Sequence, residues 1–484
     1  MLPASLLCLS CGSGAPNNVL QNTTYRAFVT NNVSAGTLSA GIYVVDAEKD
    51  VRVSASITAG DAPGMMVVTP NHAQTLVFSG NGTATSDNLF SIIDNAKQSS
   101  ANKVTLPGMT ESFVVSPDSS TAYVAVPTAS VTDQSSGVVE VVNLSSGANT
   151  PISCPPLGSN SPSIVCVTAA TTPPTTSGLN LPYTNLAIGN TGNRVLALSD
   201  PSASNLIADT IAVITPSSIG TTNPVVTFVP GFDHPVAAFF SSDDSLAYVL
   251  NCGAECGGTQ ASIQQLNLTN NTLGAYLPLC VPITGSNPIQ CASSAAGSVA
   301  LVNGSTMYVA GTPPYINGSP SQPCTGETAA QSCGLLTIVN LDTMSVTNAA
   351  PIVITDGYHT RMALGANGQL FIGANTCTEI SAATETRGCL SIYNTLPATT
   401  VGSNPPGGVL VPPEIGDATG IQPIATRTGT SSIAPNVVYV IQGGSFYIYD
   451  ATTDALQYNP VNPSESGRIV NLVGDFVDVI TVDF

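Results

Sequence analysis

Short runs of apolar residues alternate with polar turns along almost the whole chain. In the clearest copy, the apolar run 113–115 leads through the polar turn 116–120 into a second run, 122–125. A loop of variable length follows, and then a third run at 138–142. Runs of this length, bounded by Ser, Asn, Asp and Gly, predict β-strands joined by turns. We therefore expect repeated units of three strands and a weaker fourth.

This unit can be followed eight times. The second strands centre on Phe28, Val77, Tyr123, Leu196, Tyr248, Tyr308, Phe371 and Tyr439. The third strands centre on Tyr43, Ile92, Val139, Val213, Ile263, Ile338, Ile392 and Ile448. Most are apolar on both faces, which is expected when a neighbouring sheet covers each side. We predict an all-β β-propeller with eight four-stranded blades, and seven blades as the alternative.

The two ends of the chain are predicted to complete one sheet together. The first unit starts at its second strand, around residues 25–30, with no first strand before it. The chain finishes with the apolar strand 476–482, which has no partner strands of its own. We expect this strand to complete the first blade and close the ring, and residues 25–484 to form a single propeller domain. The alternative is a loose edge strand, which would promote aggregation.

Several of these strands resemble the YVTN family of β-propeller repeats. The resemblance is carried by Val115-Ser116-Pro117-Asp118, Tyr123-Val124-Ala125, Tyr308-Val309-Ala310, Tyr43-Val44-Val45-Asp46 and Ile338-Val339-Asn340-Leu341-Asp342-Thr343. It extends over the chain after about residue 25, although some units, such as 185–198, lack Ser-Pro-Asp. Members of this family commonly have seven blades, whereas eight units are counted here. The resemblance implies the propeller fold and no particular activity.

The composition excludes several classes of protein. With 43% hydrophobic and only 8% charged residues, the chain can bury a large core and is not intrinsically disordered. Its formal net charge of −19 opposes binding to nucleic acid and to anionic lipid. Beyond the first residues, no stretch offers the ~20 consecutive apolar residues of a transmembrane helix. We expect membrane contact only through an N-terminal lipid anchor.

The first residues resemble the end of a bacterial secretion signal. An apolar stretch, residues 2–9, precedes Ser10-Cys11-Gly12, and a cysteine in that setting is a candidate for lipidation. Two features depart from the pattern, because no basic residue precedes Arg26 and Cys8 stands where leucine is usual. We expect residues 1–24 to be a signal remnant and flexible tether, with a frayed apolar N-terminus as the alternative. The expected location is the bacterial cell surface, the periplasm or the extracellular space.

The other ten cysteines fall into close pairs along the chain. The expected disulfides are Cys154–Cys166, Cys252–Cys256, Cys280–Cys291, Cys324–Cys333 and Cys377–Cys389. Their spacing indicates local bridges formed in an oxidising compartment. Zinc binding is the alternative, but repeated Cys-x2-Cys motifs are absent and the chain has only three histidines. In a propeller, all five pairs map to second-to-third or fourth-to-first connections, which share one face.

Polar residues near the starts of the inner strands are the best candidates for a site, because these strands surround the axial channel. The candidates are Asp61, Glu111, Asp233, His234, Asp356, His359 and Arg361. Converging carboxylates suit a hard divalent cation such as calcium, and histidine can act as acid or base near neutral pH. In the alternative interpretation, the aspartates cap turns and the histidines fill a polar rim.

Three functions are consistent with these features. The favoured hypothesis is an exported, lipid-anchored propeller that binds a protein, glycan or small ligand through its disulfide-bonded loop face, without catalysis. The first alternative is a hydrolytic enzyme with a divalent cation at the channel mouth, where propeller lactonases place such groups, although no lactonase motif is recognised. The second is a structural subunit of the cell surface or of a filament, formed by self-assembly. The fold by itself does not choose among them.

Overall fold

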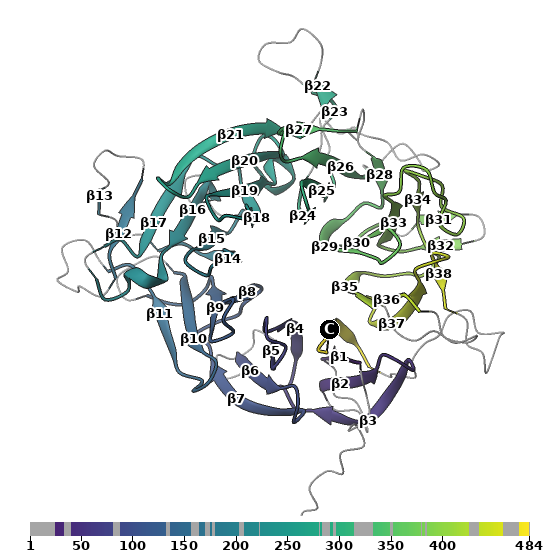
Figure 1. Ribbon diagram of the computed structural model, residues 1–484, viewed down its shortest axis with the longest axis horizontal. Helices are drawn as coiled ribbons and strands as arrows, with labels where there is room; N and C mark the ends of the chain where they lie inside the picture. The colour runs from purple at the N-terminus through teal and green to yellow at the C-terminus, as the bar shows by residue number, and fades with distance from the viewer. Residues whose placement is uncertain are drawn as a thin grey trace, which may run out of the picture.

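A computed structural model shows a ring of small β-sheets around a central axis (Figure 1). The structure describes residues 25–32, 40–80, 88–131, 136–155, 164–169, 175–176, 180–202, 208–221, 223–279, 281–282, 291–293, 297–313, 333–348, 352–378, 380–382, 385–424, 435–457 and 474–483. Residues 1–24, and with them Cys11, lie outside these ranges. The signal, tether and lipidation interpretations therefore stay predictions.

The four main strands of each blade are antiparallel and follow one another outwards from the axis (Figure 1). Blade 1 contains β39 (Phe476–Thr481), β1 (Arg26–Asn31), β2 (Gly41–Asp46) and β3 (Val51–Ile57). Blade 2 contains β4 (Pro63–Val68), β5 (Gln74–Ser79), β6 (Leu89–Asp94) and β7 (Ser99–Thr105). Blade 3 contains β8 (Phe113–Val115), β9 (Thr121–Val126), β10 (Val138–Asn143) and β11 (Asn149–Ile152). Blade 4 contains β14 (Tyr183–Ile188), β15 (Val195–Ser199), β16 (Thr210–Ile214) and β17 (Val226–Pro230), extended outwards by the added strand β12 (Cys166–Thr168), which pairs parallel with β17, and by β13 (Thr175–Thr176).

The second half of the ring repeats this order. Blade 5 contains β18 (Pro235–Phe240), β19 (Leu246–Asn251), β20 (Ser262–Asn267) and β21 (Thr272–Pro278). Blade 6 contains β24 (Val299–Asn303), β25 (Thr306–Gly311) and β26 (Gly334–Asn340), with both β27 (Ser345–Val346) and β28 (Ile352–Ile354) on its outer edge. Blade 7 contains β29 (Tyr358–Leu364), β30 (Gln369–Asn375), β33 (Leu390–Asn394) and β34 (Val409–Leu410). Blade 8 contains β35 (Ala418–Ile424), β36 (Val437–Gln442), β37 (Ser445–Asp450) and β38 (Ala455–Leu456). The predicted eight blades are confirmed, and every predicted second and third strand has its expected place.

Helical structure in the described ranges includes two 3-10 turns, η2 (Pro216–Ser218) and η3 (Gly253–Cys256). Two further hairpins, β22–β23 (Val281–Pro282 and Cys291–Ser293) and β31–β32 (Ile380–Ala382 and Glu385–Arg387), project from connections between blade strands. Among the described residues, no helix has both the length and the apolar character needed to cross a bilayer.

The last strand closes the ring. The C-terminal β39 pairs antiparallel with β1, so that Val479 lies opposite Val29. It supplies the inner strand of blade 1, which confirms the predicted closure. The ring of Phe476 packs edge-on against that of Tyr43, with the two centroids 6.0 Å apart. Residues more than 400 positions apart in sequence thus complete a single sheet, and β39 covers the inner edge of β1.

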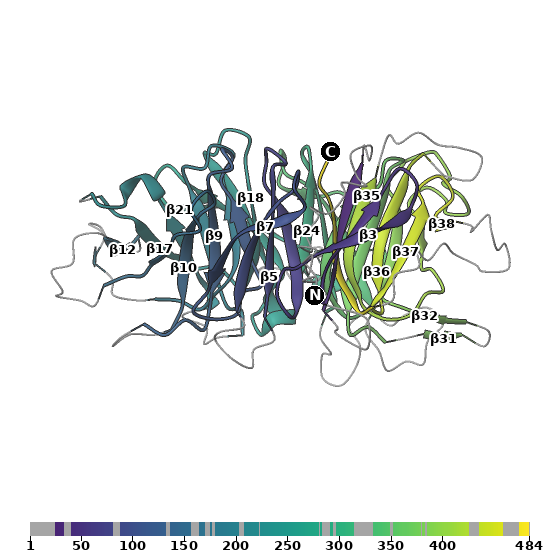
Figure 2. The ribbon, with the colours of Figure 1, turned by 90° about the horizontal axis from the view of Figure 1, so that it is seen from below.

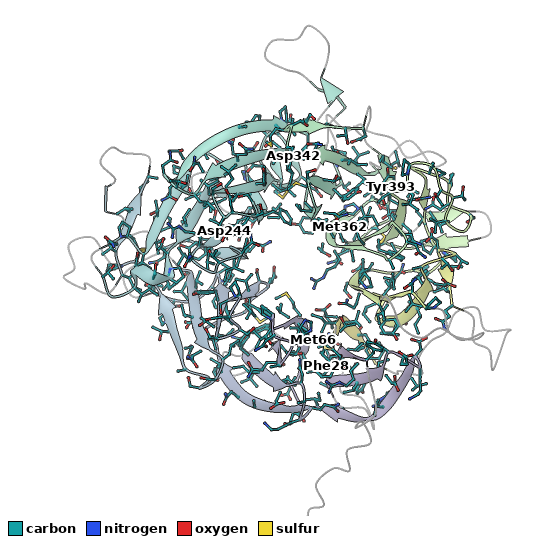
Figure 3. All side chains as sticks on the ribbon, in the orientation of Figure 1. Phe28, Met66, Asp244, Asp342, Met362 and Tyr393 are labelled. Atoms are coloured by element: carbon teal, nitrogen blue, oxygen red, sulfur yellow. A yellow bond between two sulfur atoms is a disulfide. The ribbon has the colours of Figure 1, made fainter. Side chains whose placement is uncertain are left out.

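The hydrophobic core is divided into eight clusters, one at each interface between neighbouring blades. Phe28, labelled in Figure 3, is fully buried between blades 1 and 2. Tyr439 and Phe446 occupy the interface between blades 8 and 1 and are also fully buried. Each blade therefore presents an apolar surface to both neighbours, which explains why the strands are apolar on both faces.

Short turns between first and second strands occupy one face of the ring. In blade 3, Ser116 Oγ donates to Asp118 Oδ1 over 2.5 Å, and the same oxygen accepts from the Ser120 amide at 3.0 Å. In blade 5, Ser241 Oγ donates to Asp243 in the same way. Aspartate at this position satisfies the turn amides, so the recurring Ser-x-Asp pattern has a structural cause.

Two disulfides, Cys252–Cys256 and Cys377–Cys389, occupy second-to-third connections that emerge on the opposite face. The expectation of a single face fails for Cys154–Cys166, because Cys166 lies opposite Val226 at the other end of blade 4. The bridges Cys154–Cys166, Cys252–Cys256 and Cys377–Cys389 confirm three of the five expected pairs. Cys333 is also disulfide-bonded, whereas Cys324 and Cys280 lie outside the described residues. Figure 2 shows β31 and β32, which lie between Cys377 and Cys389 in sequence, below the ring in the edge-on view. We call this side the disulfide face.

Candidate functional site

A cavity of about 760 Å³ lies on the axis of the ring and is lined by residues of all eight blades. Figure 3 shows side chains filling the blades while the centre remains open. Many lining residues stand at the start of a first strand or the end of a second strand, including Ser298, Tyr358 and Asn375. Both positions belong to the disulfide face, so the cavity lies toward that end of the axis.

Polar contacts join the inner strands of neighbouring blades around the cavity. Ser112 Oγ lies 3.1 Å from Asn185 Oδ1 and accepts from the Leu186 amide, which links blades 3 and 4. Asn185 Nδ2 donates to the carbonyl oxygen of Val236 over 2.6 Å, which links blade 4 to blade 5. These side chains are fixed by hydrogen bonds, so the wall is already organised before any ligand binds.

Arg361 places a positive charge in the cavity. Its Nε donates to the carbonyl oxygen of Thr419 over 2.9 Å, and its guanidinium lies 3.7 Å from Asp478 Oδ2. Asp478 is only 6% exposed and accepts from the amides of Met66 and Val479, both at 2.9 Å. Burial raises the pKa of Asp478, and Arg361 and the two amides oppose that rise. Arg361 therefore stabilises a buried carboxylate on the closing strand while it faces the cavity.

The rim of the cavity is acidic around Tyr358. This tyrosine is 43% exposed and begins β29. Its pKa is raised first by burial of the phenol and then by the charges of Glu255, Glu111 and Asp200. Glu111 and Asp200 line the same cavity. Three carboxylates from blades 3, 4 and 5 thus create a negative potential at one aromatic side chain.

Glu255 is held in place by the shortest disulfide-bonded loop. It lies in η3, between Cys252 and Cys256, and its Oε1 accepts from the Thr312 amide at 3.1 Å. Thr312 Oγ1 in turn donates to the carbonyl oxygen of Gly357, beside Tyr358. Burial raises the pKa of Glu255 to about 7. Its charge therefore changes near neutral pH.

His359 is fully buried behind the rim although it lines the cavity. Its Nε2 lies 3.0 Å from the carbonyl oxygen of Thr355, and a proton on Nε2 would be donated to that oxygen. Its Nδ1 has no hydrogen-bond partner among the described residues. Burial lowers the pKa of His359 to about 4, so the ring is neutral at pH 7 and is a weak base.

A second pocket, of about 310 Å³, lies at blade 5 and contains Asp233 and His234. Asp209, one residue before β16, lies in the same pocket. His234 Nδ1 is 3.3 Å from Asp209 Oδ1 and 3.4 Å from Asp233 Oδ1. These three side chains form the group of described residues with donor atoms arranged to hold a metal ion.

The structure separates the residues proposed from the sequence. Glu111, His359 and Arg361 line the central cavity, whereas Asp233 and His234 line the pocket at blade 5. Neither of these two sites includes Asp61 or Asp356. Asp61 is exposed, and Asp356 accepts from the Thr378 amide over 2.8 Å. Asp356 thus contacts the loop that follows β30.

Sequence reasoning missed four residues of these sites. They are Asp200, Asp209, Glu255 and Tyr358. The sequence contained a clue to Glu255, because this residue is the one acid between Cys252 and Cys256. The sequence contained no clue to Asp209. This residue lies between β15 and β16 of blade 4 and approaches His234 of blade 5 only in the folded ring.

No protein-family model matches this chain, and no curated protein matches it. Among solved structures, the dihydro-heme d1 dehydrogenase NirN in complex with DHE is 10% identical, covers 95% of this chain and 76% of its own, and has a TM-score of 0.57. Hydrazine synthase of Kuenenia stuttgartiensis is 14% identical, covers 81% of this chain and 96% of its own, and has a TM-score of 0.50. At such identities the likeness shows the propeller fold alone.

Proposed function

We propose that this protein is an exported propeller that binds a small cationic ligand at the rim of its central cavity and does not transform it. The acidic rim around Tyr358 carries this proposal. Carboxylates beside an aromatic ring attract primary or quaternary amines, through ion pairing and cation–π contact. The formal net charge of −19 adds a long-range attraction for cations.

The charge of Arg361 supports a ligand that also carries a hydrogen-bond acceptor. Arg361 lines the cavity with a side chain 38% exposed, and part of its charge is already balanced by Asp478. Its guanidinium can therefore donate to a neutral oxygen of the ligand, because Asp478 already supplies a negative partner for the arginine. The ligand would therefore place its amine beside Tyr358 and a polar oxygen toward Arg361.

Ligand binding requires only charged and polar contacts in the cavity, whereas hydrolysis would also require an acid–base group or a metal ion there. The one histidine lining the cavity is neutral and tied to Thr355, and a base with a pKa of about 4 abstracts protons poorly at neutral pH. The metal-capable group of the described residues lies in the separate pocket at blade 5. NirN and hydrazine synthase are named as enzymes, but their similarity to this chain is limited to the fold.

The disulfides are the basis for proposing export. Three bridges join described cysteines, and disulfides persist mainly in oxidising compartments. Lipidation of Cys11 would hold the ring at a membrane surface through the tether of residues 1–24. A YVTN-type origin of the repeat belongs to the same proposal. Self-assembly into a surface structure is the remaining alternative, and it predicts light scattering that grows with protein concentration.

Isothermal titration with spermidine and with choline, in low salt and EDTA, tests the ligand class. We expect saturable binding of at least one of them, weakened about two- to fivefold by Glu111→Gln or Asp200→Asn through loss of one charge pair. Asp61→Asn is the matched control, because this exposed carboxylate is outside the cavity. Absence of binding, or equal binding by all variants, would refute the proposal. Turnover of lactones or esters lost in Arg361→Met would favour the enzyme instead.

A further inference from the structure

The pocket at blade 5 brings one imidazole nitrogen and two carboxylates together from separate segments. Asp233 and His234 immediately precede β18, and Asp209 precedes β16 of the neighbouring blade. The donor atoms of the three residues all lie within 4.8 Å of one another. This pocket is distinct from the central cavity, so the argument does not depend on the proposed ligand.

His234 is buried, and its Nδ1 has no hydrogen-bond partner among the described residues. The residue is 3% exposed, and Nδ1 makes no hydrogen bond among the described residues although two carboxylate oxygens lie within 3.4 Å. Buried polar atoms are nearly always satisfied, so this nitrogen needs an explanation. The backbone of His234 has a φ of 57°, a conformation that restricts which residues can replace it.

The distances from His234 Nδ1 to the two carboxylate oxygens equal those between neighbouring ligand atoms around a small metal ion. In a tetrahedral site with bonds of about 2.0–2.1 Å, neighbouring ligand atoms are about 3.3–3.4 Å apart. The two measured separations from His234 Nδ1 are 3.3 and 3.4 Å. We propose that Asp209, Asp233 and His234 form a binding site for a divalent transition-metal ion of the zinc class.

The donor set favours zinc over calcium. Calcium takes six to eight oxygen ligands, whereas zinc accepts one imidazole nitrogen and two carboxylate oxygens. Three protein ligands leave a fourth position for water or a small ligand. Asn251, Gln264 and Tyr276 line the same pocket.

The loop after η3 keeps the donors accessible and oriented. A Cβ at Gly258 would lie 1.9 Å from Asp233 Oδ1 and 2.7 Å from His234 Nδ1, so a larger residue would fill the space beside both donors. Asp233 is fixed by the amides of Thr259 and Gln260, at 2.9 and 2.7 Å. The adjacent Cys252–Cys256 disulfide restrains this loop.

The test uses the full chain stripped with EDTA and titrated with Zn²⁺ and, separately, with Ca²⁺. We expect one Zn²⁺ per chain at this site and at least roughly a tenfold weaker affinity in Asp209→Asn, since one anionic ligand is lost. Asparagine can still accept the His234 amide, which Asp209 Oδ1 does at 3.3 Å, so the fold should be retained. His234→Asn is the second variant, because asparagine tolerates a positive φ.

Asp356→Asn is the matched control, because this carboxylate of blade 7 accepts a loop amide and lies outside the pocket. It should bind Zn²⁺ like the parent chain. Co²⁺ gives a second readout, because tetrahedral cobalt has intense visible absorption that should vanish in His234→Asn. The proposal is overturned if Zn²⁺ does not bind, if Ca²⁺ binds more tightly, or if both variants bind Zn²⁺ as the control does.

Discussion

Arg26 and Asp483 join the two ends of the propeller through a bidentate ion pair. The guanidinium donates from Nε to Asp483 Oδ2 over 2.7 Å and from Nη2 to Oδ1 over 2.5 Å. Its Nη1 also donates to the carbonyl oxygen of Asn95 in blade 2. The side chains of Arg26 and Asp483 are only 13% and 19% exposed, so water screens this ion pair less than it screens a pair on the surface.

Asp483→Asn is expected to lower the free energy of unfolding by about 1–2 kcal/mol, because it leaves a largely buried guanidinium with one charged partner fewer. Urea denaturation measures this change. Asp94→Asn is the control, since its pair with Lys97 is exposed on the lysine side and should contribute about 0.5 kcal/mol or less. Equal effects of the two substitutions would mean that the closure pair has no special role.

Removal of residues 475–484 should abolish the cooperative unfolding of the ring. It deletes β39, uncovers the inner edge of β1, and removes Phe476 and Val479 from the interface between blades 8 and 1. An exposed strand edge of this kind promotes aggregation. Adding a peptide of residues 474–484 should restore a sharp thermal transition. A truncated chain that melts like the full chain would contradict ring closure as the stabilising element.

Arg361→Met should destabilise the fold in a pH-dependent way. Burial already raises the pKa of Asp478, and loss of the arginine raises it further. An acid whose folded pKa exceeds its unfolded pKa contributes stability at low pH that is lost as pH rises through the folded pKa. The loss should be small near pH 4 and about 1–3 kcal/mol at pH 8. Arg361→Met with Asp478→Asn should show no such pH dependence, which urea melts at both pH values can establish.

Glu255 should make stability fall between about pH 4.5 and 7. Its folded pKa is about 7, against 4.5 for the free side chain, so the folded protein holds the proton more tightly. Stability from this group is present below pH 4.5 and is lost as pH rises to about 7. Glu255→Gln should therefore stabilise the protein at pH 8 relative to the parent, by up to about 3 kcal/mol. Identical unfolding curves of parent and variant at pH 8 would count against a buried carboxylate.

The disulfide face offers a further test. Cys377→Ser with Cys389→Ser removes a bridge that spans 12 positions, and we expect a loss of about 2–3 kcal/mol, because the unfolded chain regains loop entropy. Thermal melts of the oxidised protein measure this loss. Strong reductant should lower the stability of the parent chain by more than that of the double variant. If reductant changes neither protein, the bridges do not stabilise the fold in solution.

The blade count, the closing strand and three cysteine pairs were all predictable from the sequence. Each depends on local information: short apolar runs predict strands, the missing first strand predicts a partner for residues 476–482, and cysteines a few residues apart can bond without knowledge of the rest. The apolar pattern on both strand faces even indicated that sheets pack against sheets.

The composition of the two sites was decided by the tertiary structure. Asp61, Asp233 and Asp356 occupy similar places in the repeat, yet Asp61 is exposed, Asp233 lies beside a histidine, and Asp356 accepts from the Thr378 amide. Asp209 approaches His234, and Glu255 influences Tyr358, across different blades. A repeat pattern specifies where each strand lies within its blade, but distances between loops of neighbouring blades depend on how the blades pack and how each loop folds. Those distances determine which polar side chains meet.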